Sequence, residues 1–393
     1  MLLRARRVLP IDGPAIDDGG VLVDGGRIMA VGPFGEFGRA ADEDLGDVLL
    51  TPGLVNAHTH LELSHHRPAA VRPASFAAWI GEMANGRDVD TAAATRDGVA
   101  ECLQHGVTCV GDISKFASTT RPILAASGIR GVSYGEALGF GPARPRFDAG
   151  LAAAVDVPVG GRIVKGVTPH APYTVAADGY RAALGLGLPL ATHLAESVEE
   201  TIFVRELDGP LADVWRRLGG WEPADHAEPF DGSPVAYAAS LGLLDVPAVL
   251  AHCNVVDDAD LALLAAGRAS VAWCPRTHER FSHPPHRWRD MLAAGVNVAI
   301  GTDSRATSPD LNLLAEAAAV DAPAAELWPR VTLAGARALG LAEVCGSITP
   351  GKAADLAAFE LGGGEEDVLR SAWAAVRVWI AGDEATFQEA TPC

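Results

Sequence analysis

The sequence has few cysteines, and none is placed as in a metal-binding pair or a disulfide framework. Its six cysteines are spread over 393 residues without a Cys-x-x-Cys pair. We therefore expect reduced thiols and a cytoplasmic protein. Apolar runs of membrane-spanning length are missing as well, and no apolar segment follows the arginines near the N-terminus. The sequence therefore predicts no membrane partner and no secretion signal.

Positive charge is also scarce. The 31 Lys and Arg residues are outnumbered by 50 Asp and Glu residues, which gives a formal net charge of −19. Because nucleic-acid binding depends on basic groups that neutralise phosphates, we expect no nucleic-acid partner. A small nucleoside carries no polyanionic backbone and stays open as a substrate. The oligomeric state is open too, with a homodimer as one option.

The chain begins with one kind of pattern and continues with another. Residues 1–50 are short apolar pieces separated by Asp-Gly and Gly-Gly turns, which is typical of antiparallel hairpins. From Leu54 onward, apolar strand-like runs alternate with alanine-rich helical runs, which favours a parallel sheet. The expected strands are 54–60, 108–113, 129–134, 162–168, 188–193, 248–252, 270–274 and 297–303. Eight such units predict an α/β fold of the (β/α)8 TIM-barrel kind.

The last part of the chain returns to turns and short strands. Residues 346–359 indicate a turn and a strand, and residues 376–380 indicate another strand. We therefore expect residues 1–52 and 344–393 to form one small, discontinuous β-sandwich domain. Residues 53–343 would form the barrel domain.

Histidines and an aspartate stand at the ends of several expected strands. His58 and His60 are two residues apart, so in a strand their side chains leave the same face. His193, His252 and Asp303 close three later strands. Active sites of such barrels are built at the carboxyl ends of the strands. Imidazole and carboxylate groups gathered there predict a catalytic metal site.

These strand ends, together with Gly351-Lys-Ala-Ala-Asp-Leu356, resemble the amidohydrolase superfamily over nearly the whole chain. The resemblance implies four metal ligands, which are His58, His60, His193 and Asp303. They would bind one divalent metal ion, with zinc as the first expectation and iron as the alternative. His252 would be bonded to the water on the metal or to the substrate, and Asp303 would also take a proton from that water.

The run Thr168-Pro-His-Ala-Pro-Tyr-Thr174 resembles the mononuclear deaminases of this superfamily, whose histidine at this place, here His170, meets the substrate. Binuclear members instead carry a carbamylated lysine on this strand, where the sequence has Lys165. Glu196 follows His193 by three residues, where the deaminases keep a proton shuttle. The resemblance therefore implies an enzyme, an aminohydrolase that hydrolytically deaminates an aminopurine nucleoside.

The residue types suit this reaction. A bound metal lowers the pKa of water toward neutrality. Attack on an aromatic carbon that bears an amino group requires a ring nitrogen to gain a proton. Glu196 could donate that proton and then help ammonia leave. The expected catalytic residues are Glu196, His252 and Asp303.

The sequence also bears on other enzyme classes. Gly131-Val-Ser-Tyr-Gly135 matches the elbow of serine hydrolases, but residues 136–142 cannot start the helix which that motif requires. The Pro-Cys-x-x-Cys signature of zinc deaminases of another fold is missing. Deaminases of adenosine, S-adenosylhomocysteine, methylthioadenosine or guanine, and triazine chlorohydrolases, stay as alternatives. A non-catalytic scaffold on the same barrel is a more remote one.

Two loops narrow the expected substrate. His60-Leu-Glu-Leu-Ser64 and the run 273–283 resemble the aminodeoxyfutalosine deaminases of menaquinone biosynthesis. The resemblance implies conversion of 6-amino-6-deoxyfutalosine to futalosine and ammonia. This nucleoside carries a benzoate group, which an arginine would bind best, and the candidates near the expected barrel mouth are Arg276, Arg280 and Arg305. The other expected substrate contacts are Glu136, His170, His278 and His283.

Overall fold

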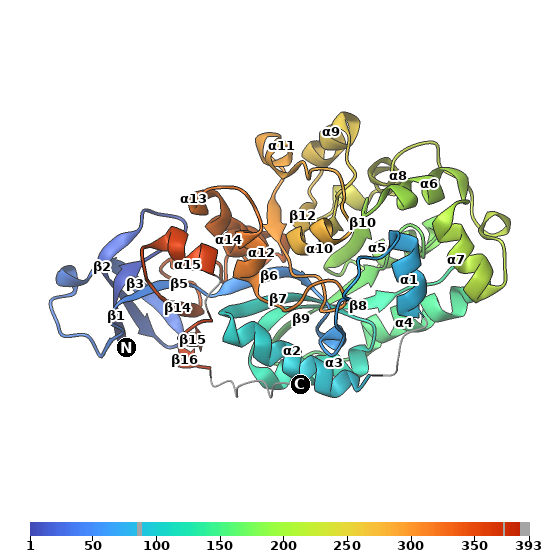
Figure 1. Ribbon diagram of the computed structural model, residues 1–393. Helices are drawn as coiled ribbons and strands as arrows, with labels where there is room; N and C mark the ends of the chain where they lie inside the picture. The colour runs from blue at the N-terminus through green and yellow to red at the C-terminus, as the bar shows by residue number, and fades with distance from the viewer. Residues whose placement is uncertain (85–88, 372–373, 386–393) are drawn as a thin grey trace.

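Strands from both ends of the chain form one mixed sheet. The computed structural model describes residues 1–84, 89–371 and 374–385. This sheet has the strand order β16-β15-β14-β5-β1-β2-β3, with the short β4 paired to β1, and lies at the left of Figure 1. β5 pairs antiparallel with β14, so the C-terminal strands continue the sheet that the N-terminal strands begin. Its strands are β1 Leu2–Val8, β2 Ile16–Asp24, β3 Arg27–Pro33, β4 Glu43–Asp44, β5 Val48–Pro52, β14 Leu356–Glu360, β15 Arg377–Ile380 and β16 Asp383–Glu384.

The second sheet is an eight-stranded parallel barrel in sequence order from β6 to β13. It closes where Thr59 bridges Asp303, and the amides of Thr302 and Asp303 both donate to the carbonyl of His58 at 3.1 Å. The ends of the first and last barrel strands are therefore joined directly. The strands are β6 Leu54–Thr59, β7 Val107–Ser114, β8 Arg130–Ala137, β9 Arg162–Pro169, β10 Leu190–Leu194, β11 Ala248–His252, β12 Ser270–Trp273 and β13 Val298–Ile300.

Helices connect the barrel strands and surround them (Figure 1). Local capping defines several of their starts: Ser197 accepts the amide of Glu200 at the start of α6, and Asp257 and Asp260 form a capping box at the start of α9. The α-helices are α1 Phe76–Ala84, α2 Thr91–Gln104, α3 Ala117–Ser127, α4 Arg144–Asp156, α5 Ala177–Leu184, α6 Val198–Glu206, α7 Pro210–Gly219, α8 Pro234–Ser240, α9 Asp258–Ala266, α10 Pro275–Arg280, α11 Trp288–Ala293, α12 Leu313–Ala318, α13 Ala324–Leu327, α14 Leu333–Ala338 and α15 Glu365–Ser371. Short 3-10 helices are Phe34–Phe37, Leu61–Leu63, Gly141–Ala143, Pro223–Asp225, Leu243–Asp245 and Trp328–Val331.

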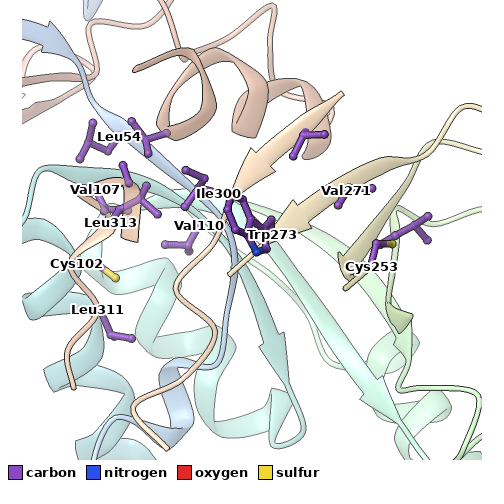
Figure 2. Close-up of a cluster of buried hydrophobic side chains, with 14 of the residues drawn as sticks. Leu54, Cys102, Val107, Val110, Cys253, Val271, Trp273, Ile300, Leu311 and Leu313 are labelled. Carbon is purple, nitrogen blue, oxygen red and sulfur yellow. The ribbon is translucent and has the colours of Figure 1, made fainter. Parts of the chain in front are cut away.

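Apolar side chains hold the strands and helices together. Leu54, Val107 and Ile300 come from β6, β7 and β13 and are buried in one cluster (Figure 2). Fully burying one such side chain contributes roughly 1.5–3 kcal/mol. Phe359 of β14 belongs to the same cluster, so the terminal sheet packs directly on the barrel.

The predicted barrel with a separate sheet from both chain ends is confirmed. Each expected barrel strand overlaps an observed one. The last is shorter than expected, because the chain leaves the strand after Ile300 and turns at Asp303, whose φ is 55°. The terminal strands form one continuous sheet. No helix among the described residues is long and apolar enough to cross a membrane.

Candidate active site

Four side chains converge at the carboxyl ends of β6, β10 and β13. His60 Nε2 lies 3.2 Å from His193 Nε2. Asp303 Oδ1 lies 3.8 Å from His58 Nε2 and 3.7 Å from His60 Nε2. All four side chains are nearly buried. The structure therefore brings together the residues that the sequence suggested as metal ligands.

The histidines present lone pairs to a common point. His193 Nδ1 lies 3.0 Å from the carbonyl of His170, so it carries the hydrogen and leaves the Nε2 lone pair free. His58 Nε2 is buried without a hydrogen-bond partner among the described residues. Burial, reinforced by neighbouring histidines, lowers the pKa of His58 and His60 and keeps both rings neutral. With Zn–N distances of about 2.0–2.1 Å, tetrahedral ligand atoms lie roughly 3.3 Å apart, so this donor set fits a divalent metal ion.

Asp303 is held with one carboxylate oxygen toward the histidines. The hydroxyls of Thr277 and Thr307 donate to Oδ2 at 3.0 and 2.9 Å. Oδ1 is thereby left facing His58 and His60. A ligating carboxylate oriented by hydrogen bonds to its other oxygen is the usual arrangement around a bound metal.

Glu196 follows β10 and is 4% exposed. Its Oε1 lies 3.4 Å from His252 Nε2, and the hydroxyl of Tyr173 donates to its Oε2 at 3.4 Å. Burial, together with the carboxylates of Asp303 and Glu200, raises the pKa of Glu196 well above its ordinary range. A buried carboxyl group with a raised pKa at the base of a cavity is suited to carry a proton.

The backbone turn that carries Glu196 is fixed from two sides. The carboxylate of Glu200 accepts the amides of Ala195 and Glu196 at 2.9 and 2.7 Å. The side-chain amide of Asn254 donates to the carbonyl of Glu196 at 3.0 Å. Ala195 has φ of 50° and His252 has φ of 74°, a left-handed conformation that side-chain-bearing residues rarely adopt. Such backbone strain persists only where the surroundings enforce it, and it is common at functional sites.

A cavity of about 540 Å³ opens from this cluster. Its volume lies within the range of about 300–1,000 Å³ that is usual for small-molecule sites. Five of the expected site residues reach it from the base, namely His60, His193, Glu196, His252 and Asp303.

His170 and Glu136 also line the cavity, as expected from the sequence. His170 Nδ1 lies 2.8 Å from the hydroxyl of Thr174, and its Nε2 lies 4.0 Å from Glu136 Oε1. Burial raises the pKa of Glu136 to about 7, against the opposing effect of Lys115 and Arg146. These two side chains therefore continue the polar surface beside His193, and one ligand atom of each of the three residues lies within 4.8 Å of the others.

The three arginines expected to bind a substrate carboxylate are not among the described residues that line the cavity. Arg276 pairs with Glu316 at 2.6 Å and with Asp310 at 2.8 Å. Arg280 donates to a backbone carbonyl, and Arg305 donates to a carboxylate of α2 at 3.1 Å. Because these guanidinium groups already hold loops in place, the structure does not bring them to the ligand space.

His278 and His283 lie outside the cavity lining as well. Their rings are 5.4 Å apart, and His278 Nδ1 lies 2.9 Å from Asn254 Oδ1. Asn254 in turn holds the carbonyl of Glu196. His278 therefore supports the loop that carries Glu196, and the structure does not place it as a substrate contact.

Sequence reasoning missed both cations that line the cavity among the described residues, Lys115 and Arg146. They lie in the connections after β7 and β8, where no strand-end pattern marks them. Glu62 also lines the cavity, and the unusual sequence of residues 60–64 could have indicated this residue. A large part of the lining is apolar and comes mostly from α1 and α7, with Trp79, Ile80, Met83, Leu211, Val214, Trp215, Leu218 and Trp221; we call this part the apolar wall.

Lys165 of β9 points away from the ligand cluster. Its ammonium donates to the carbonyl of Val155 on α4. A carbamylated lysine that bridges two metals would have to reach His58 and Asp303 from inside the barrel. The position of Lys165 therefore favours a site for a single metal ion.

The sequence matches one protein family and is similar to known deaminases. The amidohydrolase family model matches residues 49–390. A 5-methylthioadenosine/S-adenosylhomocysteine deaminase of Moorella thermoacetica is 31% identical over 384 residues, which cover 91% of this chain and 84% of the relative. An aminodeoxyfutalosine deaminase of Deinococcus radiodurans is 34% identical over 362 residues, which cover 86% and 84%.

Solved structures are similar over almost the full chain. An adenosine deaminase of Xanthomonas campestris with bound zinc is 26% identical, has a TM-score of 0.80 and is matched over 98% of this chain and 92% of its own. Aminofutalosine deaminase of Helicobacter pylori in complex with methylthio-coformycin has a TM-score of 0.87 over 98% of this chain and 100% of its own. At 23% identity, the second similarity concerns the fold.

Proposed function

Because this chain belongs to the amidohydrolase family, we propose that it hydrolyses 6-amino-6-deoxyfutalosine to futalosine and ammonia. The chain is a hydrolase of carbon–nitrogen bonds, a deaminase of adenosine-like nucleosides, and it binds a metal. The proposal concerns the substrate within that class and the role of each residue.

We propose zinc as the metal, held by His58, His60, His193 and Asp303. Three imidazoles and one carboxylate are a donor set that zinc accepts readily. The bound metal supplies the Lewis acidity that makes water nucleophilic near neutral pH. Asp303 keeps one oxygen on the hydroxyls of Thr277 and Thr307 and has the other free to accept a proton from the attacking water.

In this proposal Glu196 transfers the remaining protons and His252 orients it. Water adds to the purine carbon that bears the amino group, and the adjacent ring nitrogen must gain a proton as that bond forms. The protonated Glu196 donates it, since its raised pKa keeps a proton available near neutral pH. Glu196, now ionised, takes the proton of the hydroxyl group that the water added and passes it to the amino group, which leaves as ammonia when the carbon–nitrogen bond breaks. The proton that Asp303 accepted from the water then restores the protonated Glu196. His252, 3.4 Å from Glu196 Oε1, orients this carboxyl group.

The observation that carries the substrate proposal is the makeup of the cavity wall. Aromatic and aliphatic side chains of α1 and α7 line the same cavity as Lys115 and Arg146. An aromatic ring buries well against the apolar side chains, and a carboxylate is bound best by the two cations. A benzoate group on the 5′ side of the nucleoside contains both features, whereas adenosine has no 5′ substituent that carries a ring or a carboxylate.

The test is ammonia release from 6-amino-6-deoxyfutalosine, S-adenosylhomocysteine, methylthioadenosine and adenosine. The wild-type protein should be most efficient on the benzoate-bearing nucleoside. Arg146→Met should lower its kcat/KM by about 10- to 150-fold, the effect of one charge-assisted hydrogen bond. Adenosine should be affected little. Arg144→Met is the matched control, because Arg144 lies on the same helix but pairs with Asp148 and Asp178.

Two results would contradict the substrate proposal. One is equal wild-type efficiency on adenosine and the benzoate-bearing nucleoside. The other is an equal loss on both substrates in Arg146→Met, which would indicate damage to the cavity rather than loss of a carboxylate contact. Neither result would contradict the assignment of the protein as a deaminase.

Deamination of S-adenosylhomocysteine and methylthioadenosine is the second candidate. It is favoured by the Moorella relative, which is 31% identical over 91% of this chain. The apolar wall could accept a methylthio group, and the two cations could accept the carboxylate of S-adenosylhomocysteine. The same substrate panel decides between the two candidates.

A further inference from the structure

A buried carboxylate on the cavity wall accepts no hydrogen bond from any residue that the structure describes. Glu136 stands near the end of β8, is 9% exposed and lines the cavity. Among the described residues no N–H or O–H group donates a hydrogen bond to its carboxylate, and His170 Nε2 lies 4.0 Å from its Oε1. Burying a carboxylate without a hydrogen-bond partner is costly, so the position calls for donors that arrive with a ligand.

Glu62 on the same wall provides the contrast. Its carboxylate accepts the backbone amides of Lys115 and Phe116 at 3.3 and 3.1 Å. Glu62 is therefore occupied in holding the loop after β7. Lys115 and Arg146 favour the charged form of Glu136 through space, and neither side chain forms a hydrogen bond with it. Of the two wall carboxylates, only Glu136 is left to accept hydrogen bonds from a ligand.

The chemistry of the nucleoside identifies those donors, given the proposed function. An ionised carboxylate only accepts hydrogen bonds. A 5′-substituted aminopurine nucleoside offers few donors in its common part, namely the amino group and the two ribose hydroxyls. The amino group has to lie at Glu196 and the metal ligands, where it leaves. The vicinal 2′- and 3′-hydroxyls are then the donors available to Glu136, and its two oxygens can accept both.

We infer that Glu136 binds the ribose 2′,3′-diol and makes the enzyme selective for ribonucleosides over deoxynucleosides. This inference rests on the proposed function, and it holds for any 5′ substituent, since every nucleoside in the class shares the diol. It assigns selectivity for the sugar to β8, separate from the cations expected to bind the 5′ substituent.

The test uses adenosine, 2′-deoxyadenosine and 3′-deoxyadenosine as probes of the metal-loaded protein. Loss of one hydrogen bond to a charged group should lower wild-type kcat/KM by about 10- to 150-fold for each deoxynucleoside. In Glu136→Gln and Glu136→Ala this preference should shrink toward one, mainly because adenosine becomes worse. Glu62→Gln is the matched control and should keep the preference, even where it lowers all three rates together.

Each outcome decides the matter. Equal wild-type efficiency on the three nucleosides overturns the inference. This result needs no variant, so it does not depend on whether a variant folds. An unchanged preference in Glu136→Gln, or a collapse in Glu62→Gln, overturns it as well. If Glu136→Gln loses only S-adenosylhomocysteine, the carboxylate pairs with the ammonium of that substrate instead. Failure to deaminate any nucleoside would overturn the proposed function, which is a different result from deamination without sugar preference.

Discussion

Replacement of Glu196 by glutamine is the sharpest test of the proposed proton transfers. Glutamine keeps the size of the side chain and an acceptor for the hydroxyl of Tyr173. The hydrogen bonds with Glu200, which accepts, and Asn254, which donates, involve only the backbone of residue 196. The fold and the metal ligands should therefore be unaffected. What is lost is the ability to bind and release a proton near His252 and Asp303.

The expected size of the effect follows from how often this carboxyl group acts. A general acid–base group typically contributes about 10²–10⁴-fold to the rate. Glu196 is proposed to transfer a proton twice in one turnover, so we expect a loss of about 10³–10⁴-fold in kcat, or roughly 4–5.5 kcal/mol. The measurement is steady-state ammonia release, with metal content determined on the same samples. Glu206→Gln, an exposed glutamate at the end of α6, is the control.

Retention of most activity in Glu196→Gln would refute the assignment, because another residue would then carry the protons. Loss of activity together with loss of metal would refute the reasoning in a different way, since it would mean that Glu196 helps to hold the metal. Only loss of turnover with the metal retained agrees with the geometry.

Three further predictions concern the metal, the turn and pH. Elemental analysis should find one divalent metal per chain, and two metals with a carbamylated Lys165 would contradict the outward position of that side chain. Glu200→Gln should lower kcat more than it raises KM, because it loosens the turn of Glu196, and Glu200→Asp should not restore the rate. Burial lowers the pKa of His286 to about 3, so its contribution to stability is present above pH 6.5 and is lost as pH falls below that value. Between pH 7 and pH 5 the wild type should lose about 1–2 kcal/mol more stability than His286→Gln, measured by denaturant unfolding of each protein at both pH values.

The candidate metal ligands could be predicted because a parallel barrel places its strand ends together. His58 and His60 are linked by the two-residue period of a strand, and Asp303 follows the strand that closes on β6. These relations depend on local periodicity and on one topological rule, so they are visible in the sequence. Glu196 was identified through the resemblance to the deaminases, which keep a proton shuttle three residues after the histidine that corresponds to His193.

The side chains that surround the ligand space could not be predicted in the same way. Arg276 is adjacent to a predicted strand end, yet Glu316, forty positions further along the chain, neutralises it in the fold. Lys115 in the loop after β7 and Arg146 at the start of α4 line the cavity because of the paths of the connections that carry them, and no sequence period encodes those paths. Long-range packing determines whether a cationic side chain pairs with a carboxylate of the protein or lines the ligand cavity. The residues next to it in the sequence do not indicate which of the two occurs.

Catalysis and selectivity are therefore carried by parts of the fold with different constraints. The candidate metal ligands His58 and His193 stand on barrel strands, and His60 and Asp303 follow directly after strands. The amides of Thr302 and Asp303 connect the last strand to His58. A change there would disturb the whole barrel. The apolar wall belongs to α1 and α7, which touch few barrel strands and can change their side chains at smaller cost. Because Glu136 stands on β8 itself, selectivity for the sugar should stay constant among variants whose preference for the 5′ group has shifted through substitutions in α1 or α7.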